Sequence, residues 1–176
     1  MSFKINYNLL DLPKREHECD FEYAPELNDI TTFVSHLFII LDDDDDAINF
    51  NIFIDDIDLN VKYYFYIFVE HLFEAIKAIE CSNNFYIDFF EGYRKGLNFK
   101  LINEENYFVE VLEVPQGEKL TEFGNTVVNK DYLYNLFLDI MNDFIRVSKI
   151  YCSNMYNNQY FQEMFKDYIK NIEKLK

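Results

Sequence analysis

Three strand-like runs follow one another in the middle of the chain and constrain its fold more than any other feature. In these runs aromatic and branched apolar side chains are interrupted by single polar ones, which favours strands. The runs are Phe85–Glu91, Leu97–Asn103 and Tyr107–Val114, linked by a stretch with Gly92 and Gly96 and by Asn103–Asn106. Glycine and asparagine favour turns, and such short links join antiparallel neighbours. The region therefore predicts an antiparallel β-meander, followed by a loop that contains Pro115–Gly117 and Gly124.

Further strands are predicted ahead of the meander. Apolar residues alternate with polar ones in Ser2–Leu10 and in Ile48–Ile54, with a period of two that suits a half-buried strand. Asp55, Asp56 and Asp58 follow the second of these strands and are expected to form its exit loop. A short strand is also a candidate at Phe21–Ala24.

Helical periodicity occurs in four other segments, where apolar residues recur every three or four positions. The predicted helices cover residues 26–40, a long segment capped by Asn60, a second long segment capped by Asn129, and a terminal segment after a break at Ser153–Asn158. A strand at Leu37–Leu41 stays open as an alternative to the end of the first helix. Together these patterns predict an α+β fold, with an antiparallel β-meander packed against several amphipathic helices in a single domain of residues 1–176.

Negative charge is the strongest compositional feature. The chain has 16 Lys and Arg against 32 Asp and Glu, a formal net charge of -16, whereas about 2 to 8 units suffice for the solubility of a small domain. Asp42–Asp58 alone holds eight acidic residues and no basic one, and its first five residues are consecutive aspartates. Repulsion between adjacent carboxylates predicts a solvated loop at Asp42–Asp46. No basic stripe is available to neutralise phosphates, so the chain is not expected to bind nucleic acid directly.

Three features predict a cytoplasmic protein without a membrane partner. Cys19, Cys81 and Cys152 are odd in number and far apart, unlike the even set of a secreted disulfide scaffold. Met1–Leu12 lacks the continuous apolar stretch of a signal peptide. The longest uncharged apolar run, Ile30–Leu41, has 12 residues, and about 20 are needed to span a bilayer.

The sequence contains no recognisable catalytic, cofactor or metal motif. With four glycines it has neither a P-loop nor a GxGxxG pattern. Zinc binding would need a second ligand pair beside His17–Cys19. The aspartate run fails as a calcium-binding EF-hand loop, because Ala47 stands at the turn glycine and Phe53 at the final glutamate. Pairs such as His71 with Glu70, or Cys81 with His36, have no family-specific context, so no catalytic residue, cofactor or metal is predicted.

In size, acidity and α+β pattern the chain resembles bacterial immunity proteins of polymorphic-toxin and contact-dependent inhibition systems. The resemblance is carried by the acidic stretch Asp42–Asp58 and by the meander segment Phe85–Val114. It implies a binding protein whose partner is a basic protein, a cognate toxin such as a nuclease. On this hypothesis the partner-binding residues are Asp42, Asp43, Asp44, Asp45, Asp46, Asp55, Asp56 and Asp58, with Glu104 and Glu105 as a weaker second patch, and exposed aromatic side chains add contact area.

Three alternatives stay open. The acidic residues could form a solvated loop without a partner. A protein that mimics DNA would instead spread its acids along one face at phosphate-like spacing. An enzyme of unrecognised class would need a concave pocket with paired polar groups. The oligomeric state is not predicted, although edge strands of the meander could pair across a dimer.

Overall fold

A computed structural model describes residues 2–8, 30–41, 49–55, 57–59, 65–89, 95–113 and 121–174. Within these ranges the chain forms helices and two β-sheets, of three and four strands, which confirms the predicted α+β class. Contacts group the chain into two compact units, one of Met1–Tyr7 with Phe50–Leu138 and the other of Asn8–Asn49 with Asp139–Lys176. The count of one domain stays a prediction.

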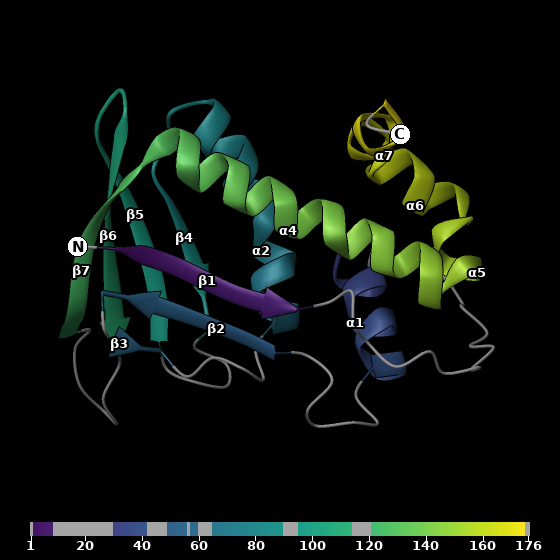
Figure 1. Cartoon of the computed structure of the whole chain (residues 1–176), viewed down its shortest axis with the longest axis horizontal. Helices are drawn as coiled ribbons and strands as arrows, with labels where there is room; N and C mark the ends of the chain where they lie inside the picture. Colours follow the sequence, from purple (N-terminus) through teal and green to yellow (C-terminus); the bar gives the residue numbers. More distant parts are fainter. Residues whose placement is uncertain are drawn as a thin grey trace. The chain divides into compact units, whose positions relative to one another are not determined.

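The four-stranded sheet of the first unit contains the three strands of the predicted meander and one further strand (Figure 1). Its strands pair antiparallel in chain order. They are β4 (Phe85–Asp88), β5 (Lys95–Asn103), β6 (Asn106–Glu113) and β7 (Thr121–Asn129). Since two residues separate β5 from β6, these long strands form a tight hairpin at the centre of the sheet.

Strand β7 occupies the segment around Gly124, so the loop that the sequence predicted there was wrong for Gly124, while its other part, Pro115–Gly117, lies outside the described residues. Thr126 and Val128 are buried while Val127 between them is exposed, which is the alternation of a strand. Gly124 pairs with Val111 at a shift in the register, and the side chain of Ile57 lies 3.2 Å from where a Cβ would stand. The glycine therefore lies at an irregularity inside the strand, where the side chain of Ile57 also comes close to its backbone. Both are ordinary reasons for glycine in a sheet.

Aromatic rings fill the core between this sheet and two helices, α2 (Phe65–Glu80) and α4 (Lys130–Tyr151). The ring of Phe137 on α4 meets those of Phe68, Phe85 and Phe99 at centroid distances of 5.6, 6.2 and 6.0 Å, each in an edge-on arrangement. Edge-on pairs are the favoured geometry of aromatic rings. The abundant phenylalanines thus supply this core.

The start of α4 confirms the predicted cap. The side chain of Asn129 accepts a hydrogen bond of 3.1 Å from the backbone N–H of Tyr132, so it satisfies one of the amides that a helix leaves unpaired at its first turn. The predicted cap of the other long helix, Asn60, lies outside the described residues.

A smaller sheet of order β1-β2-β3 completes the first unit, with β1 (Phe3–Asn8), β2 (Asn49–Ile54) and β3 (Ile57–Asp58). The first two confirm the predicted strands. Phe3 and Ile5 are buried while Lys4 and Asn6 are exposed, as a period of two requires. The ring of Phe3 lies 5.9 Å from that of Phe99, so this strand shares the aromatic core. The candidate strand Phe21–Ala24 lies outside the described residues.

The second unit is helical in its described part. It contains α1 (Ile30–Leu41), the later part of α4, α5 (Ser153–Tyr156), α6 (Gln159–Met164) and α7 (Lys166–Lys174). Helix α1 confirms the described part of the helix predicted at 26–40 and excludes the alternative strand at Leu37–Leu41. Its Phe33 meets Phe161 and Phe165 edge-on at 5.2 and 6.2 Å, and Phe144 of α4 joins the same cluster.

The predicted terminal helix is divided in two. Asn158 caps α6 by accepting a hydrogen bond from the backbone N–H of Tyr160. The helix ends at Met164, and Phe165 separates it from α7. The predicted break at Ser153–Asn158 contains the single turn α5. Along the described part of the chain, no helix combines the length and the apolar character that crossing a membrane requires.

Candidate partner-binding surface

The structure describes four of the ten predicted partner-binding residues: Asp55, Asp58, Glu104 and Glu105. The other six, Asp42–Asp46 and Asp56, lie outside the described residues, so their role stays a prediction. The four described residues belong to the first unit. Asp55 lies in the turn after β2 and Asp58 in the short strand that follows it, while Glu104 and Glu105 form the turn between β5 and β6.

Asp55 forms the turn that follows β2. Its φ of 52° lies in the left-handed region, which aspartate tolerates better than most residues. Its backbone N–H donates a 2.7 Å hydrogen bond to the carbonyl of Ser2, and its carboxylate accepts one from the backbone N–H of Ser2. Asp55 therefore joins this turn to the start of β1, a structural task that the sequence did not reveal.

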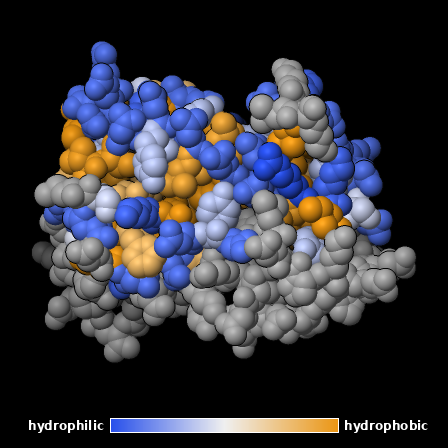
Figure 2. Space-filling view, viewed as in Figure 1, coloured by the Kyte–Doolittle hydropathy of each residue, from blue (hydrophilic) through white to orange (hydrophobic). Residues whose placement is uncertain are grey.

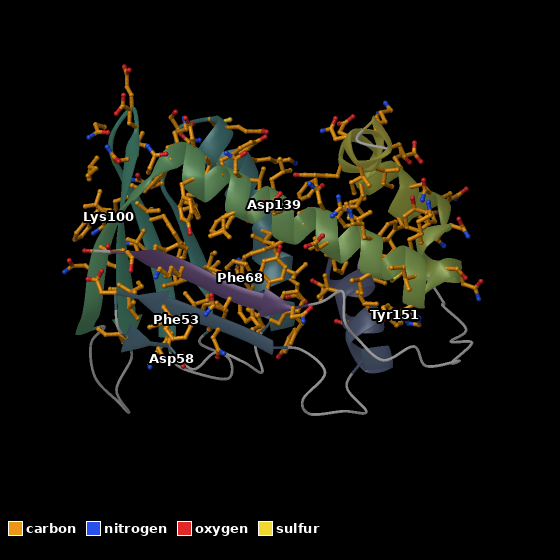
Figure 3. The ribbon with its side chains drawn as sticks, viewed as in Figure 1. Phe53, Asp58, Phe68, Lys100, Asp139 and Tyr151 are labelled. Carbon is orange, nitrogen blue, oxygen red and sulfur yellow. The ribbon has the colours of Figure 1, made fainter. Side chains whose placement is uncertain are left out.

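Asp58 lies in β3 opposite Phe53 of β2, as Figure 3 shows. The sequence predicted an exit loop here, and for Asp58 that was wrong, because the chain folds back at once and pairs with β2. The Asp58 side chain is exposed. Its neighbour Ile57 is 36% exposed, so this short strand presents an acidic and an aliphatic side chain together.

Glu104 and Glu105 form the turn between β5 and β6. The side chain of Asn103 accepts hydrogen bonds from the Glu105 backbone N–H and from the amide of Asn106, at 3.0 and 3.1 Å. The Glu105 carbonyl accepts a 2.7 Å bond from the first backbone N–H of α4, at Lys130. The backbone of the turn is thus held in place while both glutamate side chains are exposed.

An exposed isoleucine accompanies the two glutamates. Ile102 is 52% exposed, and no described residue forms an ion pair with Glu104 or Glu105. Acidic side chains beside a large apolar one suit a contact surface, because the aliphatic group supplies buried area and the charges supply orientation.

The structure does not bring the two acidic turns together. Asn129 pairs with Asn106 next to the Glu104–Glu105 turn, whereas Gly124 lies against Ile57. The strand rises by five residue steps from Gly124 to Asn129, which is about 17 Å at the usual rise of a strand. The turns stand at opposite ends of the meander (Figure 1), so a partner that touches both must span the length of β7.

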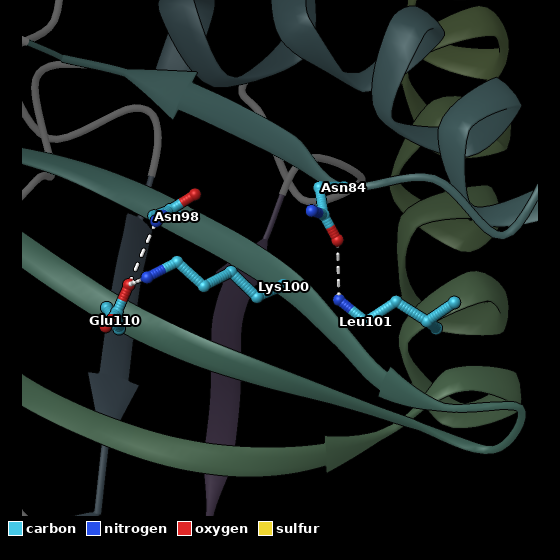
Figure 4. Close-up of polar contacts among 5 residues, drawn as sticks. All are labelled: Asn84, Asn98, Lys100, Leu101 and Glu110. Carbon is cyan, nitrogen blue, oxygen red and sulfur yellow. Dashed lines mark hydrogen bonds and ion pairs between the residues drawn. The ribbon is translucent and has the colours of Figure 1, made fainter.

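The outer face of the meander carries a polar cluster that sequence reasoning missed (Figure 4). One carboxylate oxygen of Glu110 accepts a hydrogen bond of 2.9 Å from the amide of Asn98 and lies 2.6 Å from the ammonium of Lys100. Strand alternation places Asn98 and Lys100 on one face, yet register alone decides that Glu110 of β6 stands opposite Asn98. The charge of Glu110 is balanced locally, unlike the charges of the β5–β6 turn.

Tyr86 and Gly96 form a second contact on this face. A Cβ on Gly96 would stand 1.8 Å from the hydroxyl oxygen of Tyr86, so the phenol lies directly over the glycine. Burial, followed by the nearby charge of Asp88, raises the pKa of Tyr86 far above its ordinary value of 10. Tyr86 therefore stays a neutral phenol at ordinary pH.

The described residues contain no group of three or more His, Cys, Asp or Glu that could hold a metal ion. Burial lowers the pKa of His36 below its ordinary value of 6.5. The thiol of Cys81 is exposed and that of Cys152 is buried. His17 and Cys19, the residues nearest to a zinc pattern in the sequence, lie outside the described residues.

Comparisons with models of known protein families, with curated proteins and with solved structures find no match to this chain. The geometry and charge of the chain are therefore the basis of the functional proposal.

Proposed function

We propose that this protein is an acidic binding protein that neutralises a basic protein partner, in the manner of an immunity protein that blocks a cognate bacterial toxin, for example a nuclease. The observation that carries the proposal is concentrated negative charge: eight of the acidic residues stand in Asp42–Asp58 without a basic residue, in a chain of net charge -16. A dense patch of one sign accelerates encounter with a partner of the opposite sign and orients it.

The described acidic turns support this proposal. The Glu104–Glu105 turn has a backbone held by hydrogen bonds and exposed carboxylates, so little conformational freedom of the main chain is lost on binding. Toxins that cleave nucleic acid need basic surfaces to hold phosphates. An acidic inhibitor can occupy the same surface through the charges that the toxin requires for its substrate.

The test begins with the product of the neighbouring gene, because an immunity gene normally stands beside its toxin. The two proteins are expressed together and purified through a tag on one of them, and the association rate is measured from 50 to 500 mM salt. We expect a stable complex whose association rate falls steeply as salt screens the charges.

Two variants of equal net charge separate the patch from the overall charge. In the first, each residue of Asp42–Asp46 becomes Asn. In the control, five exposed acids from other places become Asn or Gln: Glu74, Asp131, Asp139, Glu163 and Asp167. We expect the first variant to associate about tenfold more slowly at low salt, within the range of electrostatic steering, and the control to change less than about twofold.

Three results would contradict the proposal. Equal loss in both variants would show that net charge, and not the patch, governs binding. An association rate independent of salt would exclude charge complementarity. If the neighbouring product does not bind while the protein displaces DNA from an unrelated nucleic-acid enzyme in a gel-shift competition, the protein is a DNA mimic.

A further inference from the structure

A mainly apolar pocket opens on the second unit, between α4 and α7. Its apolar walls are formed by Ile145, Ile150, Tyr156, Ile169 and Ile172, and its volume is about 240 Å³. Figure 2 shows hydrophobic surface in this region, between α4 and α7. Ile150 is 55% exposed, a large value for an isoleucine that lines a hollow. Pockets with this mixture of apolar walls and a few polar groups are typical of ligand sites.

Helical spacing explains how two elements build the pocket. Ile145 and Lys149, and likewise Arg146 and Ile150, are four residues apart, so α4 presents two adjacent stripes to the pocket. Ile169 and Ile172 form one side of α7, with Glu173 next to them. Tyr156 of the short helix α5 is nearly buried and supplies an aromatic wall.

Cations stand at the rim of the pocket although the protein as a whole is strongly acidic. Arg146 and Lys149 line it, against a single carboxylate, Glu173. The guanidinium of Arg146 is 2.9 Å from the carboxylate of Asp143, and arginine has five N–H donors, so this pair leaves donors for a second anion. The ammonium of Lys149 lies 5.1 Å from the centre of the Tyr156 ring, which places a positive charge directly beside the apolar wall.

We infer that this pocket binds a small anionic amphiphile, a molecule with one carboxylate and a short apolar body. The apolar walls would take the body, and Arg146 with Lys149 would bind the carboxylate. A cavity of about 150 Å³ holds one benzene molecule, so 240 Å³ has room for a ligand of about ten non-hydrogen atoms. The inference is independent of the acidic patch and of the proposed toxin partner.

Three molecules of similar length and different charge test the inference: octanoate, 1-octanol and octylammonium. They are titrated into the full chain labelled at isoleucine methyl groups, and dissociation constants are obtained from the NMR shifts. We expect octanoate to bind with saturating shifts at Ile145, Ile150, Ile169 and Ile172, and to bind about tenfold more tightly than octylammonium because two cations face the ligand head group. The dissociation constant of octanol should lie between those of octanoate and octylammonium.

Charge variants identify the groups that select the anion. R146Q and K149Q should each weaken octanoate about two- to fivefold, the range of an exposed ion pair, and leave octanol within about twofold. E173Q should strengthen octanoate. The matched control is K166Q, since Lys166 is an exposed lysine of α7 that does not line the pocket. It should leave the dissociation constants of octanoate and octanol within about twofold of the wild-type values.

Several outcomes would overturn the inference. Octanoate could shift only residues other than the four isoleucines, or fail to saturate below its solubility limit. Octanol or octylammonium could also bind as tightly as octanoate or more tightly. Shifts of the four isoleucines that depend on protein concentration without any ligand would show that a second copy of the chain occupies the pocket, and the inference would again be wrong. The wild-type titrations decide the question even if a variant fails to fold.

Discussion

The contact between Tyr86 and Gly96 gives the sharpest test of packing in the meander. In the variant G96A the new methyl group would stand 1.8 Å from the phenol oxygen and 2.3 Å from the ring carbon that carries it. Both distances are far below van der Waals contact, so the tyrosine must leave its place. Forcing extra volume into a packed site costs about 1 to 3 kcal/mol, and alanine regains about 0.5 to 1 kcal/mol over glycine within a strand. The difference of these two ranges is about 0 to 2.5 kcal/mol, so we expect G96A to lower the free energy of unfolding by about 1 kcal/mol, the middle of that range.

A double-mutant cycle measures the part of this loss that belongs to the contact. Urea unfolding of wild type, G96A, Y86A and the double variant is followed by circular dichroism. Because Y86A removes the ring that blocks the methyl group, G96A should be neutral or stabilising in that background, with a coupling of about 1 to 3 kcal/mol between the sites. Additive effects, within about 0.5 kcal/mol, would refute the argument.

The ionisation of Tyr86 provides a second readout. Since burial raises its pKa in the folded chain, wild type is expected to retain its full stability below pH 10 and to lose stability as pH rises above 10. A phenol displaced by G96A should titrate closer to pH 10, followed by the NMR shift of labelled tyrosine, and the alkaline loss of stability should be smaller. An unchanged pKa for Tyr86 in G96A would mean that the ring had not moved.

Three further predictions concern the core, a helix cap and a histidine. F137A should lower the free energy of unfolding by about 3 to 5 kcal/mol, because Phe137 is fully buried against three other rings; a loss below about 1 kcal/mol in urea unfolding would contradict its central place. N129A should cost about 1 kcal/mol through loss of the cap on α4, whereas N135A, at an exposed position inside the same helix, should change stability by less than about 0.5 kcal/mol. Burial lowers the pKa of His36 in the folded chain, so on acidification the histidine of the unfolded chain is protonated at a higher pH than that of the folded chain. Wild type should therefore lose stability relative to H36Q as pH falls below 6.5. Parallel unfolding curves of wild type and H36Q between pH 7.5 and 5 would refute this.

The outcome at β7 and at the terminal helix shows where local patterns mislead. Gly124 suggested a loop because glycine usually ends regular structure, yet pairing with β6 supplies the hydrogen bonds that keep the strand together across an irregular register. Similarly, the apolar spacing from Phe161 to Ile172 continues across Phe165, although helix α6 ends at Met164. The spacing of apolar residues shows which side of a segment is buried. It does not show where the chain leaves one helix and begins another in a new direction.

The candidate site was predicted in part. Composition identified the acidic residues, the link at Asn103–Asn106 was predicted as a turn, and the exposed Asp58, Glu104 and Glu105 agree with a surface location. The bond between Asp55 and Ser2 and the pairing of Glu110 with Lys100 were not predictable, since each depends on segments that meet through folding.

The sequence by itself determined the α+β class, the described strands other than β3 and β7, the cap at Asn129 and the excess of negative charge, because these depend on residue type and on spacing within one segment. Tertiary structure decided which acidic side chains serve the fold, how far apart the two acidic turns lie, and that isoleucines of α4 and α7 enclose a pocket with cations at its rim. Such features arise between segments that are distant along the chain. Their positions follow from the packing of the whole unit, which no local pattern encodes.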